Sequence, residues 1–342
     1  MSPPFGNPLI PTRQLCELRQ ASVLVLGTSS LGSIDRAASI FDRFLDLGGN
    51  FFDTAYIYGQ NYKPGCCELT LGTWMRSRGV RGEVVVLGKG GHPPSTTPEA
   101  IELELHRTLD RLQTDFLDLY MLHRDSPAIP VSEFVDQMCS FLRAGLIHAY
   151  GFSNWTLERI EQARYYAGLK GQPLPSALSN HLSLAVMEKP IYPGCISVCD
   201  RASRCHLEAD RYTLIPWSSQ GRGVFTSVHN AEEFKRSDLA HCWLSDGNVE
   251  RLRRAQQLAE GRHVIPVNIA LAWVLQQPFP TFPIIGPRSV SELESSLRAL
   301  DVSLSIEEMA WLNLEDRAIT ATRSNEPVDC AISNSSRVPT GS

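Results

Sequence analysis

Two stretches of the chain decide the fold: residues 84–89, which read VVVLGK, and residues 116–123, which read FLDLYMLH. Both are runs of apolar and β-branched side chains that end on one basic residue. Such runs suit strands that are buried on both faces of a parallel sheet. A lysine at the end of a buried strand needs a partner, because an unpaired buried charge is costly. The two stretches therefore predict parallel strands whose ends carry functional side chains.

Six further runs of the same kind extend this pattern in both directions. The eight predicted strands are 22–27 (SVLVLG), 50–54 (NFFDT), 84–89, 116–123, 147–153 (IHAYGFS), 177–180 (ALSN), 213–218 (TLIPWS) and 281–286 (TFPIIG). Helical stretches alternate with them at 35–47, 98–112, 132–142, 156–168, 268–277 and 291–300. Eight strands alternating with helices favour a closed (β/α)8 TIM barrel, and a large open sheet is the alternative with the same element order.

The predicted barrel occupies most of the 342 residues as a single domain. We expect an N-terminal extension at 1–20, the barrel at 21–319 and a disordered tail rich in Ser, Asn and Pro at 320–342. The N-terminal segment shows no hairpin pattern of the sort that closes the bottom of a barrel. Two segments exceed the simple repeat, at 182–212 and 219–267, and the second holds an extra helix at 248–261. Long loops at the C-terminal face of a barrel usually carry function.

Composition argues against several classes of function. The net charge is −5 with no concentrated basic cluster, which predicts no nucleic-acid partner. No apolar run reaches about 18 residues and no signal peptide precedes the barrel, so we expect no membrane association and a cytoplasmic location. The nine cysteines form no disulfide framework. Because Cys195, Cys199, Cys205 and His206 lack the paired spacing of a zinc site, no metal is expected.

Four polar residues follow the ends of three consecutive predicted strands: Asp53, Tyr58, Lys89 and His123. Each alone has an ordinary explanation as a cap, a packing residue or a solvated charge. Together they would meet at the C-terminal face, where barrel enzymes build their active sites. Tyr58 would donate a proton to a developing alkoxide, and a nearby Lys89 ammonium would lower its pKa from about 10. Asp53 would hold Lys89, and His123 would hydrogen-bond a substrate carbonyl oxygen.

The stretches DTAYIYG (53–59), LGKG (87–90), LDLYMLH (117–123) and GFSN (151–154) resemble, in order and spacing, the motif series of the aldo-keto reductases. The resemblance covers roughly residues 20–316. It implies a catalytic tetrad of Asp53, Tyr58, Lys89 and His123, with Tyr58 as the proton donor. It also implies hydride transfer between a nicotinamide cofactor and an aldehyde, ketone or alcohol.

The same resemblance implies a cofactor site along the barrel mouth. Ser153 and Asn154 would contact the nicotinamide carboxamide beside Asp53, although on the residues alone Ser153 or Asn154 could equally cap the next helix. His181 would add a contact where the family usually has Gln. Trp217 would stack on the nicotinamide ring. The following loop would cross the pyrophosphate, through Ser218, Gln220, Gly221 and Arg222.

The adenosine end of the cofactor is implied at the eighth strand and its helix. Arg288 and Ser289 would hold the 2′-phosphate, since Arg is the natural planar partner for phosphate. Glu292 and Ser296 stand where the family often has Arg or Gln, and Asn. A carboxylate near a phosphate is unfavourable. Arg288 makes NADP the expected cofactor, and the carboxylate of Glu292 keeps NAD as the alternative.

The sequence marks the substrate contacts less specifically than the cofactor contacts. His123, Tyr56 and Trp155 are the candidate substrate contacts, and aromatic walls suit an aromatic or bulky carbonyl compound. The sequence does not determine the oligomeric state. Two other functions fit the barrel: a cofactor-binding regulatory or scaffold protein with little turnover, motivated by His181, Glu292 and Ser296, and an aldolase or isomerase that uses Lys89 as a Schiff-base nucleophile.

Overall fold

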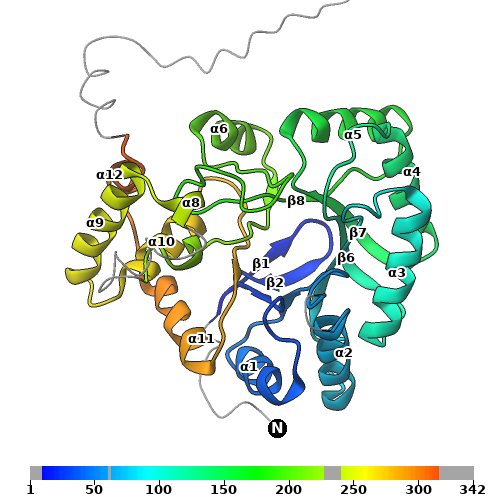
Figure 1. Ribbon diagram of the computed structural model, residues 1–342, viewed down its shortest axis with the longest axis horizontal. Coiled ribbons are helices and arrows are strands. Elements are labelled where there is room, and N and C mark those ends of the chain that lie inside the picture. The colour runs from blue at the N-terminus through cyan, green and yellow to red at the C-terminus, as the bar shows by residue number, and fades with distance from the viewer. Residues whose placement is uncertain (1–9, 61–62, 227–239, 316–342) are drawn as a thin grey trace, which may run out of the picture.

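A computed structural model describes residues 10–60, 63–226 and 240–315. Eight parallel strands form one sheet in the order β10-β3-β4-β5-β6-β7-β8-β9. Their bounds are β3 Val25–Gly27, β4 Phe51–Asp53, β5 Val85–Gly90, β6 Leu117–Leu122, β7 Ile147–Ser153, β8 Ala177–Ser179, β9 Thr213–Leu214 and β10 Ile284–Ile285. Figure 1 shows these strands surrounded by helices.

The sheet closes on itself between its last two strands. Leu214 forms a parallel bridge with Thr281. The Leu214 N–H donates to the Pro280 carbonyl at 2.8 Å, and the Phe282 N–H donates to the Leu214 carbonyl at 2.8 Å. The predicted (β/α)8 barrel is confirmed. β9 and β10 are shorter than predicted because Pro216 and Pro283 lack the N–H that a regular ladder needs.

The helices follow the strands as the alternating pattern predicts. They are α1 Ile34–Asp46, α2 Cys66–Arg78, α3 Pro98–Leu112, α4 Val131–Arg143, α5 Leu157–Leu169, α6 Arg201–Ala209, α8 Ala240–Trp243, α9 Asp246–Glu260, α10 Pro266–Leu275, α11 Val290–Leu297 and α12 Ile306–Leu312, with short 3-10 turns at Gly221–Gly223 and Arg298–Asp301. α3 begins where expected, because Thr97 accepts a hydrogen bond from the Ala100 N–H and Pro98 occupies the first turn. α9 confirms the extra helix in the long segment before α10.

Four helices, α2, α6, α8 and α12, lie outside the helical stretches predicted from the sequence. α8 and α12 are short, and the other two have identifiable reasons. α2 is buried on most of its surface, including Glu68, so it has no clear apolar stripe for periodicity to find. α6 lies within 182–212, which was expected to be a long loop, and it is held at its start by Asp200, whose carboxylate accepts from the Ser203 N–H. Its only buried residue is Leu207, so its hydrophobic pattern is weak.

The N-terminal segment corrects the sequence analysis. β1 (Thr12–Leu15) and β2 (Arg19–Ser22) form an antiparallel hairpin, which Figure 1 shows lying across the barrel in dark blue. Leu15 and Ala21 are fully buried in the barrel interior with Val25, Phe51 and Val85. The hairpin therefore closes the barrel, and part of the expected extension at 1–20 belongs to it. Its strands are short and mostly exposed, so they leave little alternating pattern in the sequence.

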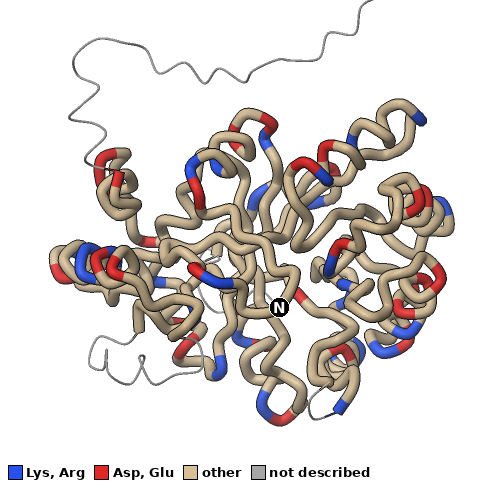
Figure 2. The backbone as a smooth tube through the Cα atoms, turned by 45° about the horizontal axis from the view of Figure 1, so that its top comes forward, with Lys and Arg blue, Asp and Glu red and all other residues tan. Residues whose placement is uncertain are grey.

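The surface carries both signs of charge. Figure 2 shows Lys and Arg interspersed with Asp and Glu along the outer helices. In the described part of the chain, each helix is too short or too polar to cross a membrane. The tail predicted at 320–342 lies outside the described residues.

Candidate active site

Asp53 and Lys89 form a buried ion pair at the C-terminal ends of β4 and β5. Each side chain is only 2% exposed. The Lys89 ammonium also donates to the Thr54 carbonyl at 3.3 Å. The strands place the two groups together because β4 and β5 are adjacent and parallel, with Asp53 opposite Leu87. Burial lowers the pKa of Lys89, and the charge of Asp53 opposes that shift.

Tyr58 reaches this pair from the loop after β4. Its hydroxyl donates to the second carboxylate oxygen of Asp53 at 3.3 Å, and the Lys89 ammonium lies 3.5 Å from the same hydroxyl. The turn is set by the Tyr58 N–H, which donates to the Ala55 carbonyl at 3.0 Å. The structure therefore brings together the acid, its ammonium neighbour and the carboxylate that the sequence analysis grouped.

His123 completes the cluster just beyond the end of β6. Its ring lies 5.9 Å from the Tyr58 ring, measured between centroids, in an edge-to-face arrangement. Burial first, and then the charges of Lys89 and Arg124, hold the pKa of His123 well below its usual value. The imidazole is therefore neutral at physiological pH, and its buried Nδ1 has no hydrogen-bond partner. A neutral imidazole at this position can hydrogen-bond a carbonyl oxygen.

The pKa of Tyr58 differs from the expectation. Burial, and then the charge of Asp53, raise it well above its usual value, and Arg124 is the cation that opposes the shift. The sequence analysis assigned that role to Lys89 and expected a lowered pKa. The reason is the depth of the site, which penalises the phenolate more than nearby cations stabilise it. Tyr58 thus stays a protonated donor at neutral pH.

Arg124 is a site residue that sequence reasoning missed. Its side chain is 7% exposed, and it donates to the His123 carbonyl at 2.9 Å and to the Cys195 sulfur at 3.4 Å. The signal was present in the sequence as a second basic residue directly after His123. A charged side chain after a buried strand is usually solvated, which is why the sequence alone did not single it out.

Ser153 and Asn154 lie at the end of β7 next to the tetrad. The Asn154 amide donates to the His123 carbonyl at 3.2 Å and to the Ser153 hydroxyl at 3.0 Å. Asn154 also adopts a left-handed backbone, with φ of 58°. The helix-cap alternative is wrong, because Thr156 caps α5 by accepting from the Arg159 N–H. These two residues are therefore held in place at the barrel mouth by contacts other than helix capping.

His181 and Trp217 lie side by side over the ends of β8 and β9. Their ring centroids are 5.0 Å apart, and the backbone forms a bridge between them. The ring nitrogens of His181 contact the hydroxyls of Ser197 at 3.0 Å and Ser183 at 3.1 Å. Burial lowers the pKa of His181 to about 3, so the ring is neutral. Trp217 is half-buried, and its buried indole N–H has no hydrogen-bond partner.

The loop after β9 has an unusual backbone. Ser218, Gly221, Arg222 and Gly223 all have positive φ, and Arg222 is exposed. Turns that combine right- and left-handed residues can form concave anion sites, so this loop is a candidate for phosphate contacts. Gly221 combines a φ of 67° with a Phe225 ring only 3.1 Å from where a Cβ would lie. A side chain there would be both strained and crowded, so the loop depends on this glycine.

The same loop contacts the C-terminal turn of α11. The Gln220 amide donates to the Ser296 hydroxyl at 3.1 Å, and Ser296 donates to the Glu292 carbonyl at 2.9 Å. Ser289 caps α11 by accepting from the Glu292 N–H. Arg288 and Glu292 form an ion pair at 2.9 Å with side chains 70% and 43% exposed. The predicted cofactor residues thus form a continuous strip from Asn154 to Arg288.

Two predicted substrate residues are not brought to the cluster. Trp155 is fully buried behind β7, where its ring stacks on Phe152 at 4.0 Å and meets Phe134 of α4 at 5.5 Å. The Tyr56 hydroxyl accepts a hydrogen bond from Arg107, and Arg111 lies over its ring at 4.4 Å. Instead, His92 lies next to His123 with ring centroids 5.4 Å apart.

These residues fit a nicotinamide dinucleotide. The Trp217 indole N–H and the Asn180 side-chain oxygen are buried without hydrogen-bond partners just beyond β9 and β8, so they offer a donor and an acceptor to a polar ligand. The positive-φ loop with Arg222 would lie along the phosphates, and Arg288 would supply a cation at the far end of the strip. A carboxamide, a pyrophosphate and a phosphate on the adenosine ribose would meet these groups in this order.

Comparisons with known proteins identify the family. The sequence profile of the Aldo/keto reductase family matches residues 23–313. An aryl-alcohol dehydrogenase of Pestalotiopsis microspora is 27% identical over 315 residues, which are 85% of this chain and 77% of that protein. A norsolorinic acid reductase of Emericella nidulans is 28% identical over 302 residues, 82% of this chain and 73% of that protein. An uncharacterised oxidoreductase of Bacillus subtilis is 29% identical over 316 residues, 86% of this chain and 92% of that protein. The chain therefore belongs to the aldo/keto reductase family, as an enzyme that acts on carbonyl or alcohol groups.

Proposed function

We propose that this enzyme reduces an aromatic aldehyde or ketone with NADPH, or oxidises the corresponding alcohol, with Tyr58 as the proton donor. The observation that carries the proposal is the contact of the Tyr58 hydroxyl with both Asp53 and Lys89, at 3.3 and 3.5 Å, beside a neutral His123. The names of the aryl-alcohol dehydrogenase and the norsolorinic acid reductase support an aromatic substrate.

The chain's own residues divide the work as follows. The bound reduced nicotinamide supplies the hydride. His123 donates a hydrogen bond to the carbonyl oxygen and orients it toward Tyr58. Tyr58 gives its proton to that oxygen as negative charge develops there. The Lys89 ammonium stabilises the phenolate that remains, and Asp53 keeps Lys89 charged and in place. The depth of the cluster excludes water, which strengthens each of these interactions.

The direct test is turnover. Purified protein, mixed with a panel of aromatic aldehydes and ketones, should consume NADPH as followed by the loss of nicotinamide absorbance. Tight NADPH binding with no turnover across the panel would favour the regulatory alternative. Covalent trapping of a substrate on Lys89 by borohydride would favour the Schiff-base alternative.

The free thiols of the described cysteines support a reducing compartment such as the cytoplasm.

The preference for NADPH rests on Arg288, and relatives named as NADP(+) enzymes support it. Glu292 pairs with Arg288, which lies just before α11, but such an exposed ion pair contributes only about 0.2–1 kcal/mol. A phosphate that binds Arg bidentately is stronger, so it should displace Glu292.

We predict opposite effects for the two partners. Arg288→Gln should raise the KM for NADPH about tenfold and leave that for NADH nearly unchanged, since one charged hydrogen-bonded contact is lost. Glu292→Gln should lower the KM for NADPH by a few fold, because the competing carboxylate is gone. Steady-state kinetics with both cofactors measures this. Equal effects of Arg288→Gln on NADPH and NADH would show that the 2′-phosphate lies elsewhere.

A further inference from the structure

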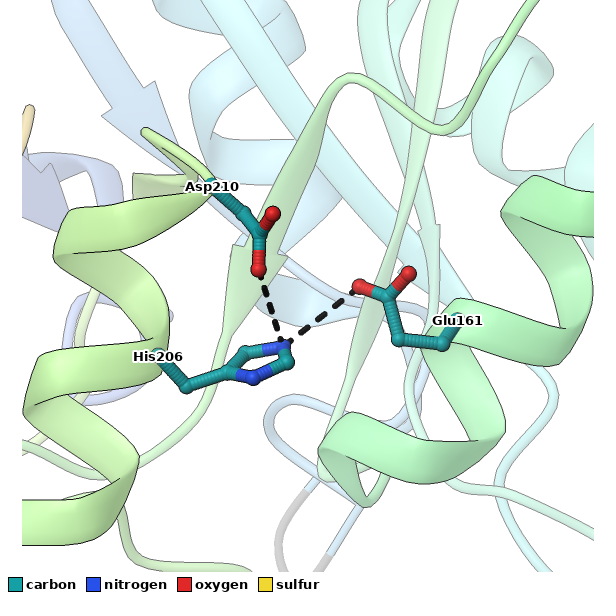
Figure 3. A group of neighbouring side chains, drawn as sticks. All are labelled: Glu161, His206 and Asp210. Carbon is teal, nitrogen blue, oxygen red and sulfur yellow. Dashed lines mark ion pairs between the residues drawn. The ribbon is translucent and has the colours of Figure 1, made fainter. Parts of the chain in front are cut away.

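A second cluster of polar side chains lies outside the active site, between α5 and α6. Glu161 comes from α5, while His206 and Asp210 lie at the end of α6 and one turn apart. Figure 3 shows the three side chains pointing toward one another across the gap between the helices. One ligand atom from each lies within 4.8 Å of the others, and this is the only such group in the part of the chain that the structure describes.

The spacing of these atoms matches the coordination shell of a small divalent cation. His206 Nε2 lies 3.5 Å from Glu161 Oε1 and 3.4 Å from Asp210 Oδ2. Zinc binds histidine nitrogen and carboxylate oxygen at about 2.0–2.2 Å, so ligands at tetrahedral corners lie roughly 3.3–3.5 Å apart. Two edges of such a tetrahedron are therefore already formed, and the third, between the two carboxylate oxygens, is no longer than 4.8 Å.

The chemistry of the group also fits a cation. His206 Nε2 is shielded from solvent and has no hydrogen-bond partner. The side chains themselves are 31%, 43% and 47% exposed for His206, Glu161 and Asp210, so an ion can enter. Two carboxylates balance the charge of a divalent ion. Tyr212 donates a hydrogen bond to Glu161 and its ring stacks on His206 at 6.0 Å, and such outer contacts hold metal ligands in position.

We propose that Glu161, His206 and Asp210 bind a zinc ion or a similar first-row divalent cation, with water in the fourth position. The ion ties α6 to α5. α6 belongs to the segment that carries Ser197 and Cys199, both of which contact His181 at the cofactor strip. The ion therefore steadies the wall behind Trp217 without touching the reacting atoms. This proposal does not depend on the substrate or the cofactor.

The other explanation of the same geometry is a protonated imidazole that pairs with two carboxylates. The cysteines considered for zinc in the sequence analysis do not take part: Cys195 contacts Arg124 and Cys199 contacts His181. A metal needs the neutral imidazole with a free lone pair, whereas the ion pair needs the imidazolium. Zinc binding at pH 7.5 therefore separates the two explanations.

The experiment measures the thermal midpoint of the full chain with and without zinc chloride, after treatment with a chelator. At a zinc concentration about 100 times Kd, we expect Tm to rise by roughly 3–5 °C. His206→Gln should abolish the rise, and Asp210→Asn should reduce it. His263→Gln changes an exposed histidine outside the cluster and serves as the matched control, with the rise retained.

Cobalt absorption identifies the ligands directly, because thiolate coordination gives an intense charge-transfer band that oxygen and nitrogen ligands do not. We expect weak visible bands of four-coordinate cobalt, without a thiolate band, and their loss in His206→Gln. An unchanged Tm with zinc, or equal zinc binding by the wild type and His206→Gln, would show that the cluster is an ion-pair group.

A separate observation concerns the substrate, and it rests on the proposed function. Arg124 is 93% buried, and no carboxylate among the described residues lies within ion-pair distance of it. Its Nε–H is buried without a hydrogen-bond partner. A buried cation without a counter-ion is expensive, so residues that persist in this state commonly bind an anion.

Arg124 is placed to act on the substrate because it adjoins His123 and bonds its carbonyl. Burial is the largest cause of the pKa shifts of Tyr58, Lys89 and His92, and the charge of Arg124 acts on all three in the lowering direction, so it opposes the raised pKa of Tyr58. We infer that the enzyme prefers carbonyl compounds that carry an anionic oxygen, such as a carboxylate or an ionised phenol, close to the reacting group.

The test compares 3- and 4-carboxybenzaldehyde with their uncharged methyl esters. In the wild type, we expect kcat/KM for the better acid to exceed that for its ester by about tenfold, the scale of a charged hydrogen bond. Arg124→Gln should remove this ratio, and Arg124→Lys should keep part of it. Turnover of the esters without any preference for the acids would overturn this inference alone. No turnover of either class would count against the proposed function instead.

Discussion

Replacing Tyr58 with phenylalanine is expected to lower kcat for carbonyl reduction by about 10²–10⁴-fold, the usual contribution of a positioned general acid. The hydroxyl that is removed is the one that contacts both Asp53 and Lys89. Phenylalanine keeps the ring that meets His123 edge to face, so the pocket should not collapse. Stopped-flow and steady-state absorbance measure the rate, and fluorescence titration should give an unchanged Kd for NADPH.

The pH dependence of the reduction rate is a second test of the role of Tyr58. Because the pKa of Tyr58 is raised and that of His123 is lowered, neither group titrates near neutrality. The rate of reduction should therefore be flat from about pH 6 to 9. Tyr166→Phe, which removes an exposed hydroxyl bonded to Asp136, is the matched control and should keep full activity. Unchanged turnover in Tyr58→Phe would remove the tyrosine from the mechanism.

Replacing Lys89 with methionine is expected to cost about 3–5 kcal/mol of unfolding free energy as well as activity. The reason is that Asp53 keeps its buried position and loses its counter-ion. The double variant Asp53→Asn/Lys89→Met should recover part of this stability, since a neutral amide tolerates burial better than a carboxylate. Urea unfolding of the wild type, both single variants and the double variant gives the coupling energy.

The pH dependence of Lys89→Met has a definite sign. Burial raises the pKa of Asp53, and without Lys89 nothing of comparable size opposes that shift. A carboxyl group with a raised folded-state pKa is stabilising below its unfolded pKa and loses that stability as pH rises. The deficit of the variant relative to wild type should therefore be larger at pH 8 than at pH 5. A deficit that is independent of pH, or a double variant no more stable than the single one, would contradict the buried-charge explanation.

Some of this structure was accessible from local patterns. β7 was predicted with its bounds, because a long apolar run identifies a buried strand without any knowledge of its neighbours. α3 was likewise predicted with its bounds, since Thr97 and Pro98 mark its start. The hairpin of β1 and β2 was not found, because its stability comes from Leu15 packing inside the barrel and not from a pattern within the segment.

The tetrad also shows which features local sequence patterns predict and which depend on tertiary packing. That Asp53, Lys89 and His123 would share one face followed from their position at the ends of parallel strands, which all point the same way. The direction of the Tyr58 pKa did not follow, because it depends on how deeply the loop is buried. Trp155 was expected beside the substrate. It lies instead behind β7, where its ring packs against Phe134 of α4.

By itself, the sequence determined the eight strands of the barrel, most of the longer helices, the order that predicts a barrel, and the residues that end the strands. These depend on side-chain periodicity and on residue type within a few positions. Only the tertiary structure decided the partners of Arg124, the placement of the hairpin and the meeting of Glu161 with His206, 45 residues further along the chain. Contacts between distant segments depend on how the helices and loops pack around the barrel, and no local pattern carries that information.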